Sequence, residues 1–262
     1  MKFDNVLVPI DGSFLSEVAV DLAIHSAGTF ATHLTFVYVA DISQYNAFGT
    51  IDGTAVAYKL RTEGRMALEH AENLAKGANL EYEAKLIEGI PWEVLSKMSK
   101  DFDMMIMGVT GKSGFSAGRV GSTAAKVIEN SYCPVLTLKS GSTKIKDILL
   151  PVSDTHMAAI DVAMETAKRV DGRVMVFAVK SKVNAEELVK EVASKFTAEG
   201  IPVDTKVAEG DIVDDIIAMS GMYDLVVMGT EGRRGLKKIL NGSVAEHVMT
   251  HALCPVTIVR DT

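Results

Sequence analysis

Two stretches of the chain carry the same pattern of glycines and a serine, and these residue types suit a phosphate-binding site. The pattern is G-x2-G-x9-G-S; it occupies residues 108–122 and recurs 121 residues later at 229–243. Glycines permit tight turns and bring a ligand close to the backbone. The final Gly-Ser opens a predicted helix, whose free N–H groups and positive dipole end attract phosphate. The serine hydroxyl can donate to a phosphate oxygen.

A plainer interpretation of this pattern stays open, namely a strand, a glycine turn and a helix capped by its serine. Recurrence of the same spacing after two apolar strands favours the ligand-binding interpretation. The motif is not a P-loop, because Ile106 stands where Gly111-Lys112-Ser113 would need a preceding glycine. No G-x-G-x-x-G follows the first predicted strand, so the dinucleotide fingerprint is also absent.

The chain as a whole is an internal repeat, which is best sought before other features. Several special residues recur at the same offset of 121, namely Gly89/Gly210, Asp103/Asp224, Cys133/Cys254 and Pro134/Pro255. The N-terminal parts of the two halves match at larger offsets, because Pro9 corresponds to Pro151 and Val39 corresponds to Val179. The first half therefore carries 19 extra residues, mainly within 41–58. We interpret this insert as a loop running into a helix, which could be a lid, a partner contact or a mobile insert.

Strands and helices are predicted to alternate in each half. In the first half the apolar runs predict strands at 6–9, 34–39, 82–87, 104–107 and 135–138, and helical spacing predicts helices between them. The fold class is therefore α/β, with two tandem repeats, each a five-stranded parallel sheet of order 3-2-1-4-5 with helices on both faces. We predict two domains, 1–140 and 145–262, joined by a short seam. The ligand crevice should lie at the carboxyl ends of strands 1 and 4.

These residues resemble the universal stress protein family in its tandem two-domain form. The resemblance rests on VPIDGS at 8–13, FVYV at 36–39, and the glycine motif followed by Cys-Pro-Val in both halves. The spacing of the glycine motif is similar to that of the ATP-binding branch. It implies ATP, or AMP or ADP, as cofactor, with Mg²⁺ as an optional companion. The implied function is an ATP-binding stress-response regulatory protein, with slow ATP turnover at most.

The resemblance also implies which residues contact the nucleotide. Asp11 would face the ribose or a metal on the phosphates, the backbone of Val39 would meet adenine, and Met107 would flank the sugar. The cofactor-binding residues expected in the first half are Pro9, Ile10, Asp11, Val39, Met107, Gly108, Gly111, Gly121, Ser122 and Thr123. Those expected in the second half are Pro151, Val152, Val179, Met228, Gly229, Gly232, Gly242, Ser243 and Val244.

The second half departs from this pattern at the first strand. Ser153 replaces Asp11 and Asp154 replaces Gly12, while the glycine loop gains Arg233, Arg234, Lys237 and Lys238. These cations could grip phosphate or form a solvated basic turn. We therefore expect the first half to bind ATP more tightly and with a stronger dependence on Mg²⁺.

Composition excludes several classes of function. The net charge of −7 provides no general attraction for nucleic acid or anionic lipid, and no window reaches 18 apolar residues. We expect no signal peptide, a cytoplasmic location and two reduced cysteines. His247 and His251 share a helix face that fits a surface or dimer contact better than a metal site, and we assign no metal ligands.

No nucleophile or general base can be named, so we assign no catalytic residues and expect no enzyme beyond weak ATP hydrolysis. Adenylate chemistry is disfavoured because Phe14 follows Asp11-Gly12-Ser13 where an SGGxDS loop would be needed. The alternative function is an interaction scaffold in which nucleotide is structural or absent. The apolar final strands, 135–138 and 256–259, should pair as an intramolecular pseudo-dimer of the two repeats, and the whole chain should form a homodimer.

Overall fold

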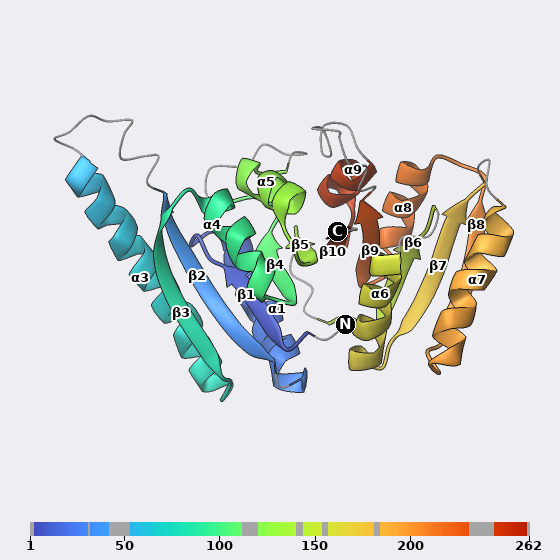
Figure 1. The fold of residues 1–262 in the computed structure, drawn as a ribbon, viewed down its shortest axis with the longest axis horizontal. Helices are drawn as coiled ribbons and strands as arrows, with labels where there is room; N and C mark the ends of the chain where they lie inside the picture. The colour runs from blue at the N-terminus through green and yellow to red at the C-terminus, as the bar shows by residue number, and fades with distance from the viewer. Residues whose placement is uncertain are drawn as a thin grey trace. The chain divides into compact units, whose positions relative to one another are not determined.

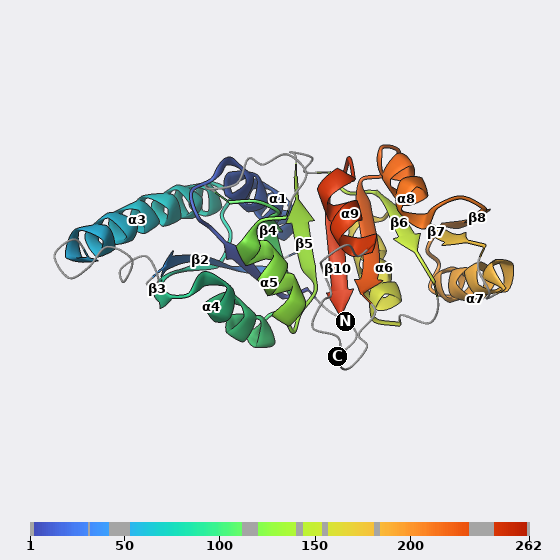
Figure 2. The same cartoon turned by 90° about the horizontal axis from the view of Figure 1, so that it is seen from above.

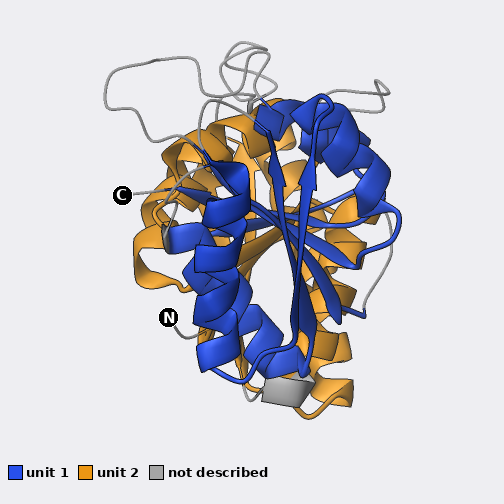
Figure 3. Ribbon diagram, turned by 90° about the vertical axis from the view of Figure 1, so that its right-hand side faces the viewer, with its two compact units in different colours: residues 1–2, 134–262 blue, residues 3–133 orange. Residues whose placement is uncertain are grey.

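A computed structural model describes residues 3–30, 32–41, 53–111, 120–139, 144–153, 157–180, 184–230 and 244–260. The chain forms two compact units, one of residues 3–133 and one made mainly of residues 134–262 (Figure 3). The predicted domains, 1–140 and 145–262, differ from this division only in where β5 is counted, and their bounds remain a prediction.

The first unit alternates strands and helices from its first strand onward. Its elements are β1 (Asn5–Pro9), α1 (Phe14–Phe30), β2 (His33–Asp41), α3 (Gly53–Gly77), β3 (Tyr82–Gly89), α4 (Pro91–Met98), a short 3₁₀ turn (Ser99–Asp101), β4 (Met104–Gly108) and α5 (Ser122–Asn130). β1 pairs in parallel with β2 and β4, and β2 pairs in parallel with β3. Helices α1 and α3 cover one face of these strands, and α4 and α5 cover the other (Figures 1 and 2).

The second unit repeats this plan after one additional strand. Its elements are β5 (Val135–Leu138), β6 (Asp147–Pro151), α6 (Met157–Val170), β7 (Arg173–Val179), α7 (Ala185–Ala198), β8 (Val203–Ala208), α8 (Ile212–Ser220), β9 (Leu225–Thr230), α9 (Val244–His251) and β10 (Val256–Arg260). β6 pairs in parallel with β7 and β9, β7 with β8, and β9 with β10. Helices α6 and α7 lie on one face and α8 and α9 on the other (Figure 2).

The predicted fold class is confirmed. The strand order is β3-β2-β1-β4-β5 in the first repeat and β8-β7-β6-β9-β10 in the second, which is 3-2-1-4-5 in both. The predicted pairing of the final strands is also present: β5 runs antiparallel to β10, and the Thr137 hydroxyl donates to the Val256 carbonyl at 2.9 Å. The strand pairs given above within each repeat are thus parallel, and the β5–β10 pair is antiparallel.

One carboxylate in each repeat joins the start of strand 1 to the start of strand 4. Asp103 Oδ2 accepts hydrogen bonds from the backbone N–H groups of Asp4 and Asn5 at 2.9 and 2.8 Å. Asp224 Oδ2 accepts from Lys146 and Asp147, both at 2.9 Å. The recurrence of this aspartate in the sequence therefore has a structural cause, since it closes the amino edge of the sheet in both repeats.

The core consists of apolar side chains between the strands and the two helix layers. The largest of those that are fully buried include Leu7, Phe36 and Met105 in the first unit, and Leu149 and Phe177 in the second. Among the described helices, none combines the length and apolar character needed to cross a bilayer.

Candidate functional site

A cavity of about 780 Å³ opens at the carboxyl ends of β1, β2 and β4 in the first unit. Its volume falls in the range typical of small-molecule sites. All ten residues expected in the first half line it: Pro9, Ile10, Asp11, Val39, Met107, Gly108, Gly111, Gly121, Ser122 and Thr123. The cavity lies where the topology predicts a crevice, at the point where the winding of the sheet reverses.

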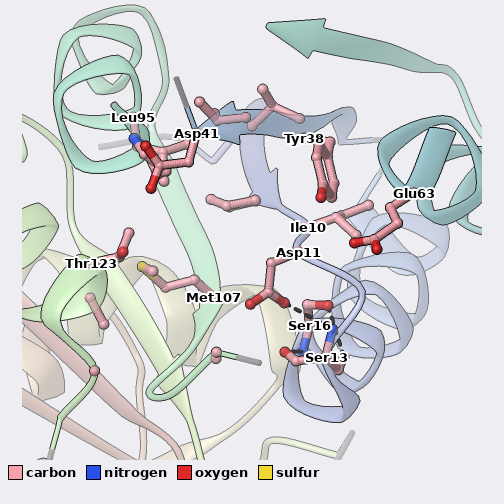
Figure 4. Close-up of a pocket in the computed structure, with 18 of the residues that line it drawn as sticks. Ile10, Asp11, Ser13, Ser16, Tyr38, Asp41, Glu63, Leu95, Met107 and Thr123 are labelled. Carbon is pink, nitrogen blue, oxygen red and sulfur yellow. Dashed lines mark hydrogen bonds between the residues drawn. The ribbon is translucent and has the colours of Figure 1, made fainter. Parts of the chain in front are cut away.

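The Asp11 carboxylate is fixed between the end of β1 and the loop after β4. Its Oδ1 accepts a hydrogen bond from the Ser13 N–H at 2.9 Å (Figure 4). Its Oδ2 lies against Gly111, where a Cβ atom would come within 2.5 Å of that oxygen. Gly12, between Asp11 and Ser13, has φ +75°, a conformation that favours glycine. Gly12 and Gly111 together therefore permit the orientation of this carboxylate.

Gly108 lines the cavity, and the absence of a side chain here also has a cause in helix packing. A Cβ atom at this position would lie 2.7 Å from Leu15 Cβ and 3.3 Å from the Leu15 carbonyl carbon. The absent side chain thus allows α1 to pack against the end of β4. Helix packing is therefore one structural cause of the glycine at this position.

Gly121 and Ser122 open α5 beside the cavity, as the motif predicts. Gly121 occupies the N-cap position, donates from its N–H to the Val109 carbonyl at 2.9 Å, and accepts from the Ala125 N–H at 2.9 Å. Ser122 is already the first helical residue, so the alternative of a serine N-cap is wrong for this first copy of the motif. The N–H groups of a first helical turn have no partner within the helix, and the helix dipole is positive there. Ser122, Thr123 and Ala124 of this turn line the cavity.

One wall of the cavity was not anticipated from the sequence. Val56, Lys59, Leu60 and Glu63 of α3 line it at i, i+3, i+4 and i+7, which is one face of a helix. The sequence predicts a loop running into a helix over residues 41–58, and the helical spacing of these four residues does not by itself show that this face meets the cavity. Of that insert, residues 42–52 lie outside the described part of the structure.

Other lining residues also escaped the sequence interpretation. They come from β2, from the beginnings of α1, α4 and α5, and from the loop after β4: Ser13, Ser16, Val37, Tyr38, Asp41, Pro91, Leu95, Thr110 and Ala124. Leu95 of α4 and Glu63 of α3 lie on opposite sides of the cavity, with Asp11 and Met107 between them (Figure 4). The cavity is thus bounded by both helix layers.

The charges of the described lining residues are mixed. Asp11, Asp41 and Glu63 are acidic and Lys59 is basic, and Lys59 Nζ lies 3.8 Å from Glu63 Oε1. The cations of the first glycine loop, Lys112 among them, belong to residues 112–119 and lie outside the described part.

The second repeat brings together part of its expected set. Pro151 ends β6 and Val152 follows it, Val179 ends β7, and Met228 and Gly229 lie near the end of β9, so all five share the carboxyl edge of adjacent parallel strands. The last expected residue that is described, Val244, begins α9 and is exposed. Gly232, Gly242 and Ser243 lie outside the described residues, as do Asp154 and the four basic residues of that loop.

The two cysteines and the histidine pair of α9 all lie in the described part of the chain. Cys133 and Cys254 are free thiols, and burial raises their pKa values to about 11 and about 12. His251 Nδ1 lies 2.9 Å from the His247 carbonyl and 2.8 Å from the Thr250 hydroxyl. Within the described ranges no cluster of three or more His, Cys, Asp or Glu side chains could hold a metal ion.

The comparison with family models decides the family. The model described as "Universal stress protein family" matches residues 2–139 and 178–260. The chain belongs to the universal stress protein family. The matched segments leave out residues 140–177, so the stretch where Ser153 replaces the first-strand aspartate falls outside the match.

Individual universal stress proteins resemble the chain over different lengths. One from Mycobacterium tuberculosis is 26% identical over 292 residues, covering 100% of this chain and 98% of its own length. One from Methanocaldococcus jannaschii is 30% identical over 141 residues, covering 52% of this chain and 82% of its own. The crystal structure of one from Archaeoglobus fulgidus has a TM-score of 0.85 at 18% identity and covers 99% of both chains, which shows the same fold.

Proposed function

We propose that the first unit binds an adenine nucleotide, ATP foremost with ADP or AMP as alternatives, and that the protein regulates a stress response through this binding. The observation that carries the proposal is that all ten expected residues line one and the same cavity of the first unit. Two of its features, the glycine loop and the helix N-terminus, come from the motif that the sequence repeats.

The residues present fit such a nucleotide at both of its ends. The first turn of α5, with Ser122 and Thr123, offers N–H groups, hydroxyls and a positive dipole end to phosphate oxygens. The Asp11 carboxylate can accept from a ribose hydroxyl, or hold a Mg²⁺ ion, which keeps most of its waters and needs few protein ligands. The cavity volume of about 780 Å³ accommodates a nucleotide.

Other parts of the proposal rest on the sequence pattern and the family. We propose that the second unit captures phosphate more weakly, because Ser153 accepts less strongly than a carboxylate. We assign no catalytic residue and propose slow ATP turnover at most. Membership of this family also underlies our proposal of a cytoplasmic homodimer.

The alternative function, an interaction scaffold, is favoured by a separate surface. Met222 and Leu253 in the second unit are 67% and 70% exposed, and a Cβ atom on Gly221, the residue before Met222, would lie 3.1 Å from Leu253 Cδ1. Exposed apolar side chains of this kind can contact a protein partner.

One experiment separates the two functions. Purified protein is denatured, and the small molecules that it releases are identified by mass spectrometry. A second sample, freed of bound nucleotide, is titrated calorimetrically with ATP, ADP and AMP. Release of an adenine nucleotide and saturable binding are expected. Absence of both would leave the scaffold as the function.

A further inference from the structure

Helix α3 is longer than its counterpart in the second repeat, and the additional part is at its N-terminal end. α3 has 25 residues and α7 has 14. At the repeat offset of 121, residues 64–77 of α3 match the whole of α7, Ala185–Ala198. Residues 53–63, which we call the α3 extension, therefore have no counterpart in α7.

Every residue that α3 contributes to the cavity belongs to this extension. They are Val56, Lys59, Leu60 and Glu63. Val56 and Leu60 are half-buried, whereas Tyr58 in the same extension is 71% exposed. The cavity of the first unit thus has a wall built from residues that the second repeat lacks.

Two contacts hold the extension over the carboxyl ends of the strands. Gly64, which directly follows it, has no side chain, and a Cβ atom there would lie 2.5 Å from Tyr38 Cδ1 and 2.9 Å from Leu86 Cδ1. The glycine therefore allows α3 to lie close on β2 and β3. Arg61 NH2 and Nε each lie 2.6 Å from Glu88 Oε1, which ties the extension to the end of β3.

The chemistry of this wall fits the uncharged part of a nucleotide. Its apolar members, Val56 and Leu60, are spaced one helical turn apart, and its charged members, Lys59 and Glu63, form an ion pair that leaves no net charge. Pro91 and Leu95 of α4 provide apolar surface elsewhere on the cavity lining. A planar base has two apolar faces and gains most from such surroundings.

The position of the wall points the same way. β1 separates β2 from β4, and α3 lies over β2 while the first turn of α5 follows β4. Two strand spacings amount to about 10 Å, which is close to the separation of base and phosphates in a nucleotide. Phosphates held by α5 would direct the base towards the α3 extension.

We propose that the α3 extension is the nucleoside-binding wall of the first site, with Leu60 and Val56 contacting the base. The inference rests on the proposed function, since it concerns how the same nucleotide is held. It gives the first site a second advantage over the second unit, independent of Asp11.

The test compares nucleotides that share the nucleoside but differ in phosphate number. Leu60→Ala and Val56→Ala in the full chain should each raise the Kd for ATP, ADP and AMP by the same factor, about tenfold for Leu60 and about threefold for Val56. Ser122→Ala, at the opposite end of the site, should raise the Kd for ATP more than that for AMP. Tyr58→Ala is the matched control, because it truncates an exposed residue of the extension, and its Kd values should stay within twofold of the wild type.

Each result bears on a defined claim. If Leu60→Ala leaves all Kd values unchanged while the wild type binds ATP, the wall inference is wrong and the proposed function stands. A loss confined to ATP would assign the extension to the phosphates and also overturn the inference. If the wild type binds no nucleotide, both the inference and the proposed function fail. Val56→Ala is the second variant should Leu60→Ala not fold, as judged by circular dichroism.

Discussion

The carboxyl edges of the two repeats share a backbone hydrogen bond between strand 1 and strand 2 and differ in the side chain that follows strand 1. In both, the residue after strand 1 bonds back to strand 2: the Ile10 N–H donates to the Val37 carbonyl and the Val152 N–H to the Phe177 carbonyl, each at 2.8 Å. The first edge has a carboxylate at position 11, whereas Ser153 stands at the matched position of the second.

Contacts away from the site are repeated almost unchanged. The Ser99 hydroxyl accepts from the Tyr132 N–H and the Ser220 hydroxyl accepts from the Leu253 N–H, both at 2.9 Å. Together with the two aspartates at the amino edge, these contacts hold the βα units in register. The comparison teaches that the scaffold and the site are separable, because one is kept in both repeats and the other is altered in one.

The largest expected effect concerns the shared framework. Asp103→Ala removes the acceptor of two backbone N–H groups and should lower the free energy of unfolding by about 2 kcal/mol. Asp224→Ala should cost about the same, because its two hydrogen bonds have the same geometry. Urea unfolding of both variants measures this. The controls are Asp103→Asn and Asp224→Asn, which keep an acceptor oxygen; a large difference between the two alanine variants would show that the repeats are not equivalent in framework.

The next effect concerns the glycine motif of the first site. A Cβ atom at Gly121 would lie 3.3 Å from Thr110 Cα and 3.3 Å from the Val109 carbonyl oxygen, both backbone atoms. Gly121→Val should therefore shift the loop and crowd the phosphates, raising the Kd for ATP at least tenfold, about 1.4 kcal/mol, with the fold retained. Gly77→Ala is the control, since a Cβ atom there meets nothing within 4 Å. An unchanged Kd in Gly121→Val would mean that this loop does not hold nucleotide.

A smaller effect compares the matched positions after strand 1. Asp11→Ala should raise the Kd for ATP about fivefold, or about 1 kcal/mol, and reduce its dependence on Mg²⁺. Ser153→Ala should change the affinity less than twofold, because a neutral hydroxyl contributes less than a carboxylate. Calorimetry on the full chain, with and without Mg²⁺, measures both. A larger loss in Ser153→Ala would reverse the ranking of the two sites.

The smallest effect is expected at the two cysteines, where the repeats should behave alike. Burial raises the pKa of Cys133 to about 11 and that of Cys254 to about 12, so both remain protonated thiols at pH 8. A thiol reagent should modify neither in the native protein and both after denaturation. Because the unfolded thiols ionise near pH 9, native stability should fall as the pH rises above that value. Rapid native labelling of one cysteine alone would show that its repeat opens more readily.

The sequence was informative where local pattern and repetition determine structure. Apolar runs and helical spacing predict the strands and most helices, the repeat offset points to the glycine motif, and the family resemblance implies the ten residues that share the cavity. The role of Asp103 was missed although its recurrence was visible, because the two N–H groups that it accepts from lie 99 and 98 residues away. The contacts of Gly108 with Leu15 likewise arise from tertiary packing of a helix on a strand.

The wall formed by α3 illustrates the same limit within the site. Its spacing marked a helix, but which side of that helix meets the crevice depends on how close α3 lies to β2. Gly64 permits this close approach, and the side chains that it meets, Tyr38 and Leu86, belong to β2 and β3. A glycine inside a predicted helix gives no indication by itself of the partner that it approaches.

The antiparallel pairing of β5 with β10 has a consequence for how the protein responds to dilution. Two separate chains that met through such strands would come apart at low concentration and leave apolar strand edges open to other partners. Here both strands belong to one chain, so each meets the other at an effective concentration set by the connecting polypeptide and not by the concentration of the protein. Their pairing is therefore independent of how much protein is present, and these edges stay covered when the protein is scarce.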